Sequence, residues 1–417
     1  MSAPAAGPAR DLRAAGCVMA AGVVAALHVG KLPPALPVLR EALGVSLLQS
    51  GFLLSLVQLA GMTLGLLTGL AVQRVGLRRS MLAGLLVLGL TSGLGALAQG
   101  PGALLLARAL EGLGFLWVVL PAPGLLRRLV PQPRLPAMLG LWSAYMPLGT
   151  ALALLLGPWV LHAGAPDAGW RAWWWGLSAL ALGFAGLVRW QVPADPLPCS
   201  PGRGPVPSAA GRHLLGLTLR SRPAWLLALA FAMYSGQWMA VIGFLPSIYA
   251  QAGMGAASAA WLSAGAAAVN IVGNIAAGRL LGRAPRPVRP LALLWGGFAA
   301  MSAGALLTFG AVDAVLVRYA GVLVFSMVGG MVPATLFGLA VRLAPSPDSV
   351  STTVGWMQQW SSLGQFAGPP LVAWAAVRAG GWQLTGWVTS VCCLLGALLA
   401  WQIERQLRAA PATRPPR

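Results

Sequence analysis

The stretch Ala26-Leu27-His28-Val29-Gly30-Lys31-Leu32-Pro33-Pro34-Ala35-Leu36-Pro37 decides how the rest of the sequence is interpreted. It carries the single lysine among the 28 basic residues of the chain, inside a run that is otherwise uncharged from Ala14 to Leu39. A spacing of three residues places His28 and Lys31 on one face of a helix. Ionisable groups at membrane depth rarely face lipid. The stretch therefore predicts a membrane-spanning helix whose charged face turns toward a central, water-accessible cavity.

The composition of the chain is that of a membrane protein. It is 58% hydrophobic and 9% charged, with a mean hydropathy of +0.76, whereas roughly a quarter of the residues are charged in soluble domains. Apolar runs of about 20 residues, enough to span a bilayer, are continuous rather than alternating, which favours helices over a barrel. We predict an all-α membrane protein with twelve transmembrane helices in two pseudo-symmetric six-helix bundles. The predicted spans are 14–36, 48–72, 80–99, 103–126, 137–160, 171–191, 223–247, 258–281, 290–310, 315–342, 350–375 and 384–404.

The basic residues behind the net charge of +20 are distributed as the predicted membrane topology requires. If both termini are inside, 22 arginines fall in the inner segments and 4 in the outer ones, as the excess of basic residues in cytoplasmic loops requires. We therefore expect a multi-pass protein of the bacterial inner membrane with both termini cytoplasmic and the first span retained, lipid as its surroundings, and no nucleic-acid partner. Four cysteines without metal or disulfide spacing predict no metal and no cofactor.

The two halves of the sequence resemble each other. Leu36-Pro37 matches Leu245-Pro246 at an offset of 209, and Gly140-x8-Gly149 matches Gly355-x8-Gly364. A stretch rich in Pro, Gly, Ser and Arg separates them, which predicts an N-terminal bundle over 1–192, a cytoplasmic linker over 193–222 and a C-terminal bundle with a short tail over 223–417. Internal repeats of this kind are typical of secondary transporters, whose site lies between the halves.

Two motifs resemble those of the major facilitator superfamily. The segment from Gly69 to Arg79 is similar to the loop motif GxLaDrxGrkx, and Arg108-Ala-Leu-Glu111-Gly112-Leu-Gly114 is similar to the pattern RxxqGxg. The chain resembles most the cyanate permease-like branch of small-anion carriers. The resemblance implies a monomeric carrier, not an enzyme, whose two bundles rock around a central cavity. It also implies that Gln73, Arg74, Arg78 and Arg79 form a cytoplasmic gate.

The gate departs from the family pattern at one position. Gln73 replaces an aspartate that in the family pairs across the bundles, and an amide cannot ionise. The latch is therefore expected to be weaker here, or Asp348 of another loop takes part.

Two interpretations of the first span stay open. The Lys31 ammonium either faces the cavity and pairs with an anionic substrate, or snorkels to the membrane surface, where Pro33 and Pro34 break the helix. His28 is either a substrate donor or proton carrier, since histidine titrates near neutral pH, or a neutral ring bonded to a neighbouring helix.

Two interpretations also hold for Arg108 and Glu111, which are three residues apart. Either they form an internal ion pair that holds the fourth span against its neighbours, or Glu111 carries the coupling proton beside Arg108.

The balance of buried charge predicts an anionic or neutral polar substrate. The N-terminal half offers Lys31 and Arg108 against the single carboxylate of Glu111. The other candidate contacts can donate hydrogen bonds or stack, although each alone is as well explained by helix packing. The predicted substrate-binding residues are Lys31, His28, Arg108, Tyr145, Tyr234, Gln237, Trp238, Asn270, Gln358 and Gln359, and the predicted proton-coupling residues are Glu111 and His28.

We expect a secondary active transporter that moves a small polar, anionic solute by alternating access, coupled to protons. The alternative is a multidrug or metabolite exporter of the same superfamily. A membrane-embedded enzyme or sensor is disfavoured because the sequence has no Walker A motif, no HExxH motif and no Cys/His cluster.

Overall fold

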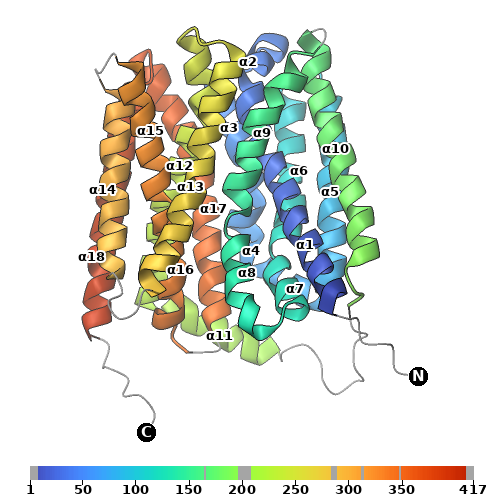
Figure 1. Ribbon diagram of the computed structural model, residues 1–417, viewed down its shortest axis with the longest axis vertical. Coiled ribbons are helices and arrows are strands. Elements are labelled where there is room, and N and C mark those ends of the chain that lie inside the picture. Colours follow the sequence, from blue (N-terminus) through green and yellow to red (C-terminus); the bar gives the residue numbers. More distant parts are fainter. Residues whose placement is uncertain are drawn as a thin grey trace.

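The computed structural model describes residues 8–163, 166–195, 208–282, 289–310, 314–346 and 349–409, and every regular element in these ranges is a helix. The long helices stand side by side, and the helices that begin and end the described chain, α1 and α18, reach the same end of the bundle (Figure 1). We call this end the terminal face and the other end the opposite face.

The twelve predicted spans all coincide with helices. The first half holds α1 (Pro8–Gly30) with α2 (Leu32–Leu43), α3 (Leu47–Ser55) with the 3₁₀ turn η1 (Leu56–Gln58) and α4 (Leu59–Val75), α5 (Leu77–Ala96), α6 (Pro101–Val119) with α7 (Ala122–Leu129), η2 (Gln132–Arg134) with α8 (Leu135–Trp142) and α9 (Tyr145–Leu161), and α10 (Pro166–Gln191). The second half holds α12 (Arg222–Gln251), α13 (Ala256–Gly282), α14 (Pro290–Phe309), α15 (Val315–Gly329) with α16 (Met331–Leu343), α17 (Val350–Ala379) and α18 (Leu384–Ala409).

Nine of these stretches, within the described residues, are long and apolar enough to cross a membrane by length and composition. Three predicted spans fall outside that set. One of them, α17, carries Gln358, Gln359 and Gln365, and another contains α9, which has only 17 residues. Polar side chains lower the apolar signal of α17, and the break before α9 shortens that helix, whereas the third span, α10, packs against helices of the first half.

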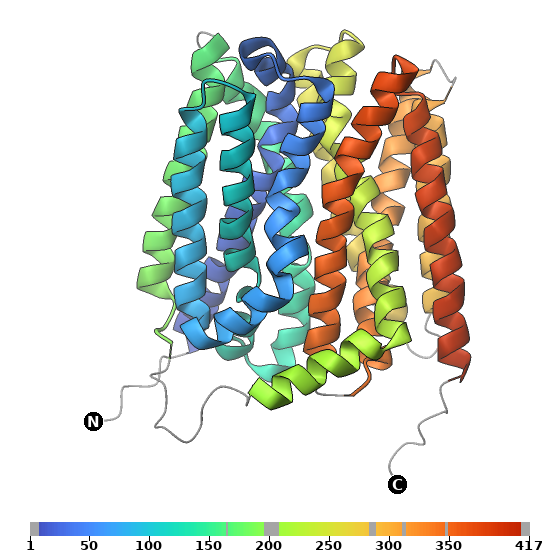
Figure 2. The same ribbon diagram turned by 180° about the vertical axis from the view of Figure 1, so that it is seen from behind.

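The linker is not irregular throughout. Residues 196–207 lie outside the described part, but α11 (Ser208–Arg220) is a helix. It lies across the terminal face beneath α4 and α17 (Figure 2), and the hydroxyl groups of Thr218 and Thr352 are 2.7 Å apart.

The two halves repeat the same close helix contact. A Cβ atom placed on Gly149 of α9 would lie 2.7 Å from the carbonyl oxygen of Val23 in α1, and one on Gly364 of α17 would lie 2.3 Å from that of Ala232 in α12. Val23 and Ala232 are separated by the same offset of 209 as the paired Leu-Pro dipeptides. Glycine at these positions lets the backbones touch, which confirms the internal repeat.

A seam between α3–α4 of the first half and α17 with α12 of the second holds the halves together. From the opposite face inward, Gly51 contacts Pro370, Leu54 contacts Gly243, and Gly61 contacts Ser362. The Gln58 amide donates to Gln365 Oε1 at 3.0 Å and the Gln359 amide to the Met62 carbonyl at 2.9 Å. Gly355, five residues after the start of α17, still contacts Leu66 of α4, so the halves pack against each other from the opposite face past the middle of the bundle.

Candidate functional site

The first membrane-spanning segment is broken at Lys31. Helix α1 ends at Gly30 and α2 begins at Leu32, because Pro33 and Pro34 have no N–H to continue the hydrogen-bond pattern. The carbonyl of Val29, which the N–H of residue 33 would have met, accepts instead from Arg108 Nη2 at 3.1 Å. The sequence thus places a helix break, and free backbone carbonyls, inside the protein rather than in lipid.

The Lys31 ammonium group lies within the first half. Its side chain is 0% exposed and forms an ion pair with Glu111 of α6. It donates to Ser92 Oγ of α5 at 3.0 Å and lies 4.6 Å from the ring centroid of Trp174 of α10. Neither of the two expected positions, a cavity open to water or the membrane surface, is the one observed. Glu111 supplies the counter-charge, so the amine needs no solvent.

Arg108 joins three membrane-spanning segments. Its Nη1 forms an ion pair with Glu111 Oε2 at 2.7 Å, which confirms the expected internal pair, and it also donates to the His28 carbonyl. Its Nε donates to the Leu53 carbonyl at 3.1 Å, close to the η1 turn, where the change from i−4 to i−3 bonding alters which carbonyls find partners. With Val29, the guanidinium therefore satisfies backbone groups in α1 and α3 from α6.

Lys31, Arg108 and Glu111 form what we call the charge triad. Their side chains are at most 2% exposed, and together they carry one net positive charge. Removing charges from water is costly unless each is paired and hydrogen-bonded. The triad satisfies that condition only while Glu111 is ionised, because a neutral Glu111 would leave two buried cations without a counter-ion.

His28 lies one turn before Lys31 and is fully buried. Within the described residues, neither of its ring nitrogens has a hydrogen-bond partner. The backbone of Leu177 in α10 is the polar group that faces the ring, so the alternative of a ring bonded to a neighbouring helix stays a prediction. An unpaired buried imidazole beside the triad is an unusual feature, since buried polar atoms are normally paired.

The candidate residues of the second half are mostly engaged in helix contacts. Asn270 Nδ2 donates to the Tyr234 hydroxyl at 2.9 Å, Trp238 Nε1 donates to Ser326 Oγ at 3.1 Å, and Gln237 Nε2 donates to the Met233 carbonyl at 2.7 Å. These bonds fit the packing alternative. None of these four side chains lies in the charge triad.

The three further candidates lie in α9 and α17. The Tyr145 ring stacks on Trp142 with centroids 4.5 Å apart. Gln359 reaches α4 through its bond to Met62. Gln358, next to it on α17, makes no side-chain hydrogen bond to any described residue.

The gate loop is held by a residue that the sequence interpretation missed. Asp195, just after α10, accepts from the backbone N–H groups of Arg78 and Arg79 at 3.1 and 3.0 Å, and Arg128 Nη1 lies 3.0 Å from its Oδ1. Burial alone would raise the pKa of Asp195, but the two N–H groups and the Arg128 guanidinium hold that pKa below its usual value. We call this arrangement the Asp195 clasp.

The clasp is a contact that the family pattern did not predict. The side chains of Gln73 and Arg74, and the whole of Asp348, lie outside the described residues, so the interpretation of these three stays a prediction. The Arg78 guanidinium donates to the Arg189 carbonyl of α10. Both contacts tie the loop to its own half. The chain has only eight acidic residues. A rare aspartate in a segment rich in arginine was therefore the sequence signal that could have predicted this contact.

Ser92, Trp173 and Trp174 were also missed. Trp173 Nε1 donates to the Lys31 carbonyl at 3.2 Å, and the Ser92 hydroxyl donates a hydrogen bond to the Trp174 carbonyl at 3.0 Å. No motif marks these residues, because serines and tryptophans are common in this chain and only the fold brings them to the break at Lys31.

Comparisons with known proteins agree with this architecture. The profile of the Major Facilitator Superfamily matches residues 18–369, and the chain belongs to that superfamily of membrane transporters. It is 26% identical over 226 residues to the cyanate transport protein CynX of Escherichia coli (strain K12), a match that covers 54% of this chain and 55% of that protein. The chain thus aligns with about half the length of this curated relative.

Solved transporters share the fold. A bacterial homolog of the human lysosomal transporter Spinster, in an inward-facing and occupied conformation, superposes with a TM-score of 0.80 at 16% identity and covers 98% of this chain and 100% of that one. The transporter FucP in an outward conformation gives 0.66 at 16% identity, over 94% of this chain and 99% of that one. The fold of the superfamily implies twelve membrane-spanning helices, and its members are transporters rather than enzymes.

Proposed function

We propose that this chain is a secondary active transporter that moves a small anionic solute across the bacterial inner membrane, with protons as the coupling ion. The observation that carries the proposal is the charge triad, a buried site with two cations and one carboxylate. The resemblance over half its length to a protein named for cyanate transport supports the same class of substrate.

The charge balance of the triad suggests how an anion and a proton are coupled. Protonation of Glu111 releases the Lys31 ammonium and leaves two uncompensated cations. An anion that then binds Lys31 restores the net charge to that of the resting triad. Because neither step is favourable alone in a site without water, the proton and the anion travel together. His28, buried beside the triad with unpaired nitrogens, is the proposed proton carrier between Glu111 and the passage.

Polar side chains outside the triad are proposed to orient the solute. Gln358 and Tyr145 are the first candidates because neither side chain is held by a hydrogen bond to another described residue. Tyr234, Gln237, Trp238, Asn270 and Gln359 can take part only if their present hydrogen bonds exchange. The terminal face, toward which most arginines lie, is proposed to be cytoplasmic.

The test is counterflow in proteoliposomes against a panel of small anions, cations and neutral solutes, with and without a pH gradient. We expect exchange of small anions, and accumulation only with the gradient. Exchange of cationic dyes without any anion exchange would favour the exporter alternative and contradict the proposal.

Two variants sharpen this test. Lys31→Met keeps the volume of the side chain but removes the ammonium, and should abolish anion exchange. Glu111→Gln mimics the protonated carboxyl, so it should retain exchange but lose the pH dependence of accumulation. Full activity of Lys31→Met, or unchanged pH dependence of Glu111→Gln, would place the substrate or proton site elsewhere.

A further inference from the structure

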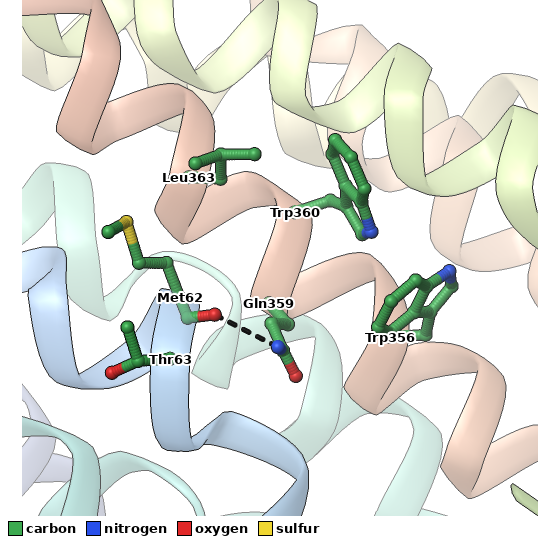
Figure 3. A pocket seen from close by; sticks show the side chains of 6 residues that line it. All are labelled: Met62, Thr63, Trp356, Gln359, Trp360 and Leu363. Atoms are coloured by element: carbon green, nitrogen blue, oxygen red, sulfur yellow. Dashed lines mark hydrogen bonds between the residues drawn. The ribbon is translucent and has the colours of Figure 1, made fainter.

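A pocket opens on the opposite face, which α2 reaches (Figure 1), between that helix and α12 of the second half. Its volume is about 480 Å³, a size typical of small-molecule sites. A second pocket, between α4 and α17, is smaller at about 150 Å³, and the hydrogen bond from Gln359 to the Met62 carbonyl beside it already belongs to the seam (Figure 3). The α2–α12 pocket is therefore the roomier place for a ligand between the halves.

The residues that line the α2–α12 pocket lie on one side of each helix. They follow the spacing i, i+3, i+4, with Pro37, Arg40 and Glu41 in α2 and Ser247, Ala250 and Gln251 in α12. Residues three and four apart lie on the same side of a helix. Arg40 and Glu41 therefore both start from the side of α2 that is turned toward α12.

Arg40 is an unpaired cation in this pocket. The other three arginines of the predicted outer segments have contacts of their own. Arg171 donates to a backbone carbonyl of α5, the Arg378 guanidinium lies 5.6 Å from the ring centroid of Trp374, and Arg318 is also engaged. Arg40 is partly buried, yet it has no hydrogen-bond, ion-pair or ring partner among the described residues. Its charge is available to a ligand with a negative group.

Glu41, the next residue, is an unpaired anion on the same side of α2. It is exposed, and no described cation lies within ion-pair distance of it. Across the pocket, Gln251 Oε1 accepts from Trp382 Nε1 at 2.7 Å. Because an indole can only donate, this bond fixes the orientation of the amide and leaves its NH₂ group, which has no partner among the described residues, as a donor. The pocket thus offers one cation, one carboxylate and one amide donor.

We propose that the α2–α12 pocket binds a small zwitterion, an α-amino acid with an apolar side chain. The carboxylate of the ligand pairs with Arg40 and accepts from the Gln251 amide. Its ammonium group pairs with Glu41, and its side chain lies against Pro37 and Val45, which form an apolar wall. A ligand with a single charge meets one group of its own sign, which selects against it.

A dry layer separates this pocket from the charge triad. Leu36 and Leu39 of α2, Leu54 of α3 and Phe244 of α12 are at most 1% exposed and belong to one apolar cluster drawn from both halves. Leu36 lies one turn inward of Arg40. A ligand held between α2 and α12 therefore stabilises the closed opposite face without entering the passage.

The test measures binding to the purified full chain in detergent with three probes of nearly equal shape. Leucine carries both charges, 4-methylpentanoate carries the carboxylate alone, and leucinamide carries the ammonium group alone. Isothermal titration calorimetry gives the affinities, and the Tm reports the stabilisation that binding produces. We expect leucine to raise the Tm in a saturable manner and the other two to bind at least about tenfold more weakly, since each lacks one charge-assisted hydrogen bond.

Two substitutions should exchange this preference. Arg40→Gln should weaken leucine binding at least about tenfold and admit leucinamide, whereas Glu41→Gln should weaken leucine binding and admit 4-methylpentanoate. Both proteins should fold like wild type, because neither side chain loses a partner among the described residues. The matched control is Arg378→Gln, on the same face but outside the lining of the pocket, which should leave the three titrations unchanged.

Three outcomes would overturn the proposal: no leucine binding by wild type, equal affinities for the three probes, or wild-type leucine affinity in either pocket variant. Binding is measured without transport, so the result does not depend on the proposed substrate.

Discussion

At the scale of single residues, the two buried cations Lys31 and Arg108 differ in the groups that they contact, and therefore in their roles. Arg108 bonds three backbone carbonyls and Glu111, so it completes backbone hydrogen bonding in two broken segments. Among the described residues, the Lys31 nitrogen contacts side chains alone: Glu111, Ser92 and the Trp174 ring. The contacts of Arg108 are structural, whereas the ammonium of Lys31 can be released by a single proton.

This difference predicts opposite behaviour of matched variants. Arg108→Met should leave buried carbonyls and Glu111 unsatisfied and lower the free energy of unfolding by about 3–5 kcal/mol, the range found when a buried pair loses one partner. Lys31→Met leaves Glu111 paired with Arg108 and should fold and purify normally. Thermal unfolding and size-exclusion profiles of the two proteins check the contrast. If Arg108→Met were as stable as wild type, the hydrogen bonds from Arg108 to the backbone carbonyls would not contribute to the free energy of unfolding.

The charge of the triad can be tested by a double-mutant cycle. Glu111→Gln raises the buried charge from one to two positive units, so we expect a loss of stability of about 3 kcal/mol. Adding Lys31→Met returns the charge to one unit and should recover part of that loss of stability, while it abolishes the anion exchange that Glu111→Gln alone retains. The interaction term from four unfolding measurements gives the coupling between the two residues. Additive effects of the two substitutions would mean that the interaction free energy between Lys31 and Glu111 is close to zero.

A second measurement on the same variants addresses the substrate. Because Glu111→Gln holds an unpaired ammonium, a bound anion should raise its Tm more than that of wild type. Lys31→Met should show no such shift. An equal anion-induced shift in all three proteins would assign anion binding to another place.

At the scale of elements, the sequence predicted the helices and their breaks better than their partners. Continuous apolar runs set the twelve spans, and Pro33 and Pro34 signalled the break after Gly30. The matching glycines Gly149 and Gly364 marked the internal repeat, and the structure adds that each allows a close helix contact, because only a missing Cβ permits such an approach. What the sequence could not predict is which side chain fills a break, since Arg108 reaches α1 across 77 residues from Lys31.

The Asp195 clasp was missed for the same physical reason. The carboxylate meets N–H groups of Arg78 and Arg79 at the start of α5, and its residue follows α10, far along the chain. A carboxylate at a helix N-terminus is favourable in itself, but local sequence does not show which carboxylate arrives. The linker helix α11 was likewise hidden by the Pro, Gly and Arg content around it.

The clasp predicts a pH-dependent contribution to stability. Because the pKa of Asp195 is lower in the folded protein, its contribution is complete above the unfolded pKa of about 3.9 and is lost as the pH falls through the folded value. Asp195→Asn should lower stability by about 1 kcal/mol at neutral pH, and the difference from wild type should disappear in acid. Tm measured from pH 7 downward checks this.

The control for that experiment is Glu404→Gln. Glu404 pairs with Arg408 on the exposed side of α18 at 2.7 Å, and exposed pairs of this type contribute little. If the Tm difference between Asp195→Asn and wild type stayed the same at low pH, the charge of the carboxylate would not be its cause.

At the scale of the whole molecule, the halves touch along the seam from the opposite face to Leu66 and Gly355, past the middle. Alternating access requires these contacts to separate when the bundles rock. Leu54 of α3 and Gly243 of α12 lie near the opposite face, where a Cβ on Gly243 would be 3.0 Å from Leu54 Cδ1. A covalent link at this point should hold the halves in the observed arrangement.

We therefore expect Leu54→Cys/Gly243→Cys to lose transport at least about tenfold on oxidation and to recover on reduction, since a Cβ atom at position 243 would meet the side chain of residue 54. Each single-cysteine variant is the control for the native cysteines, none of which lies at this point among the described residues. Transport that continued in the fully cross-linked protein would show that the seam does not open at this end.

The position of Asp195 has a practical consequence for dividing the chain. The predicted first bundle stops at 192, yet the clasp that fastens its inner loop is made by a residue three positions later. Separately expressed halves should therefore be cut after 195, in the stretch before Ser208. A first fragment that ends at 192 would lack the Asp195 carboxylate that binds its inner loop. The second fragment would carry that carboxylate without the N–H groups and the guanidinium that it binds.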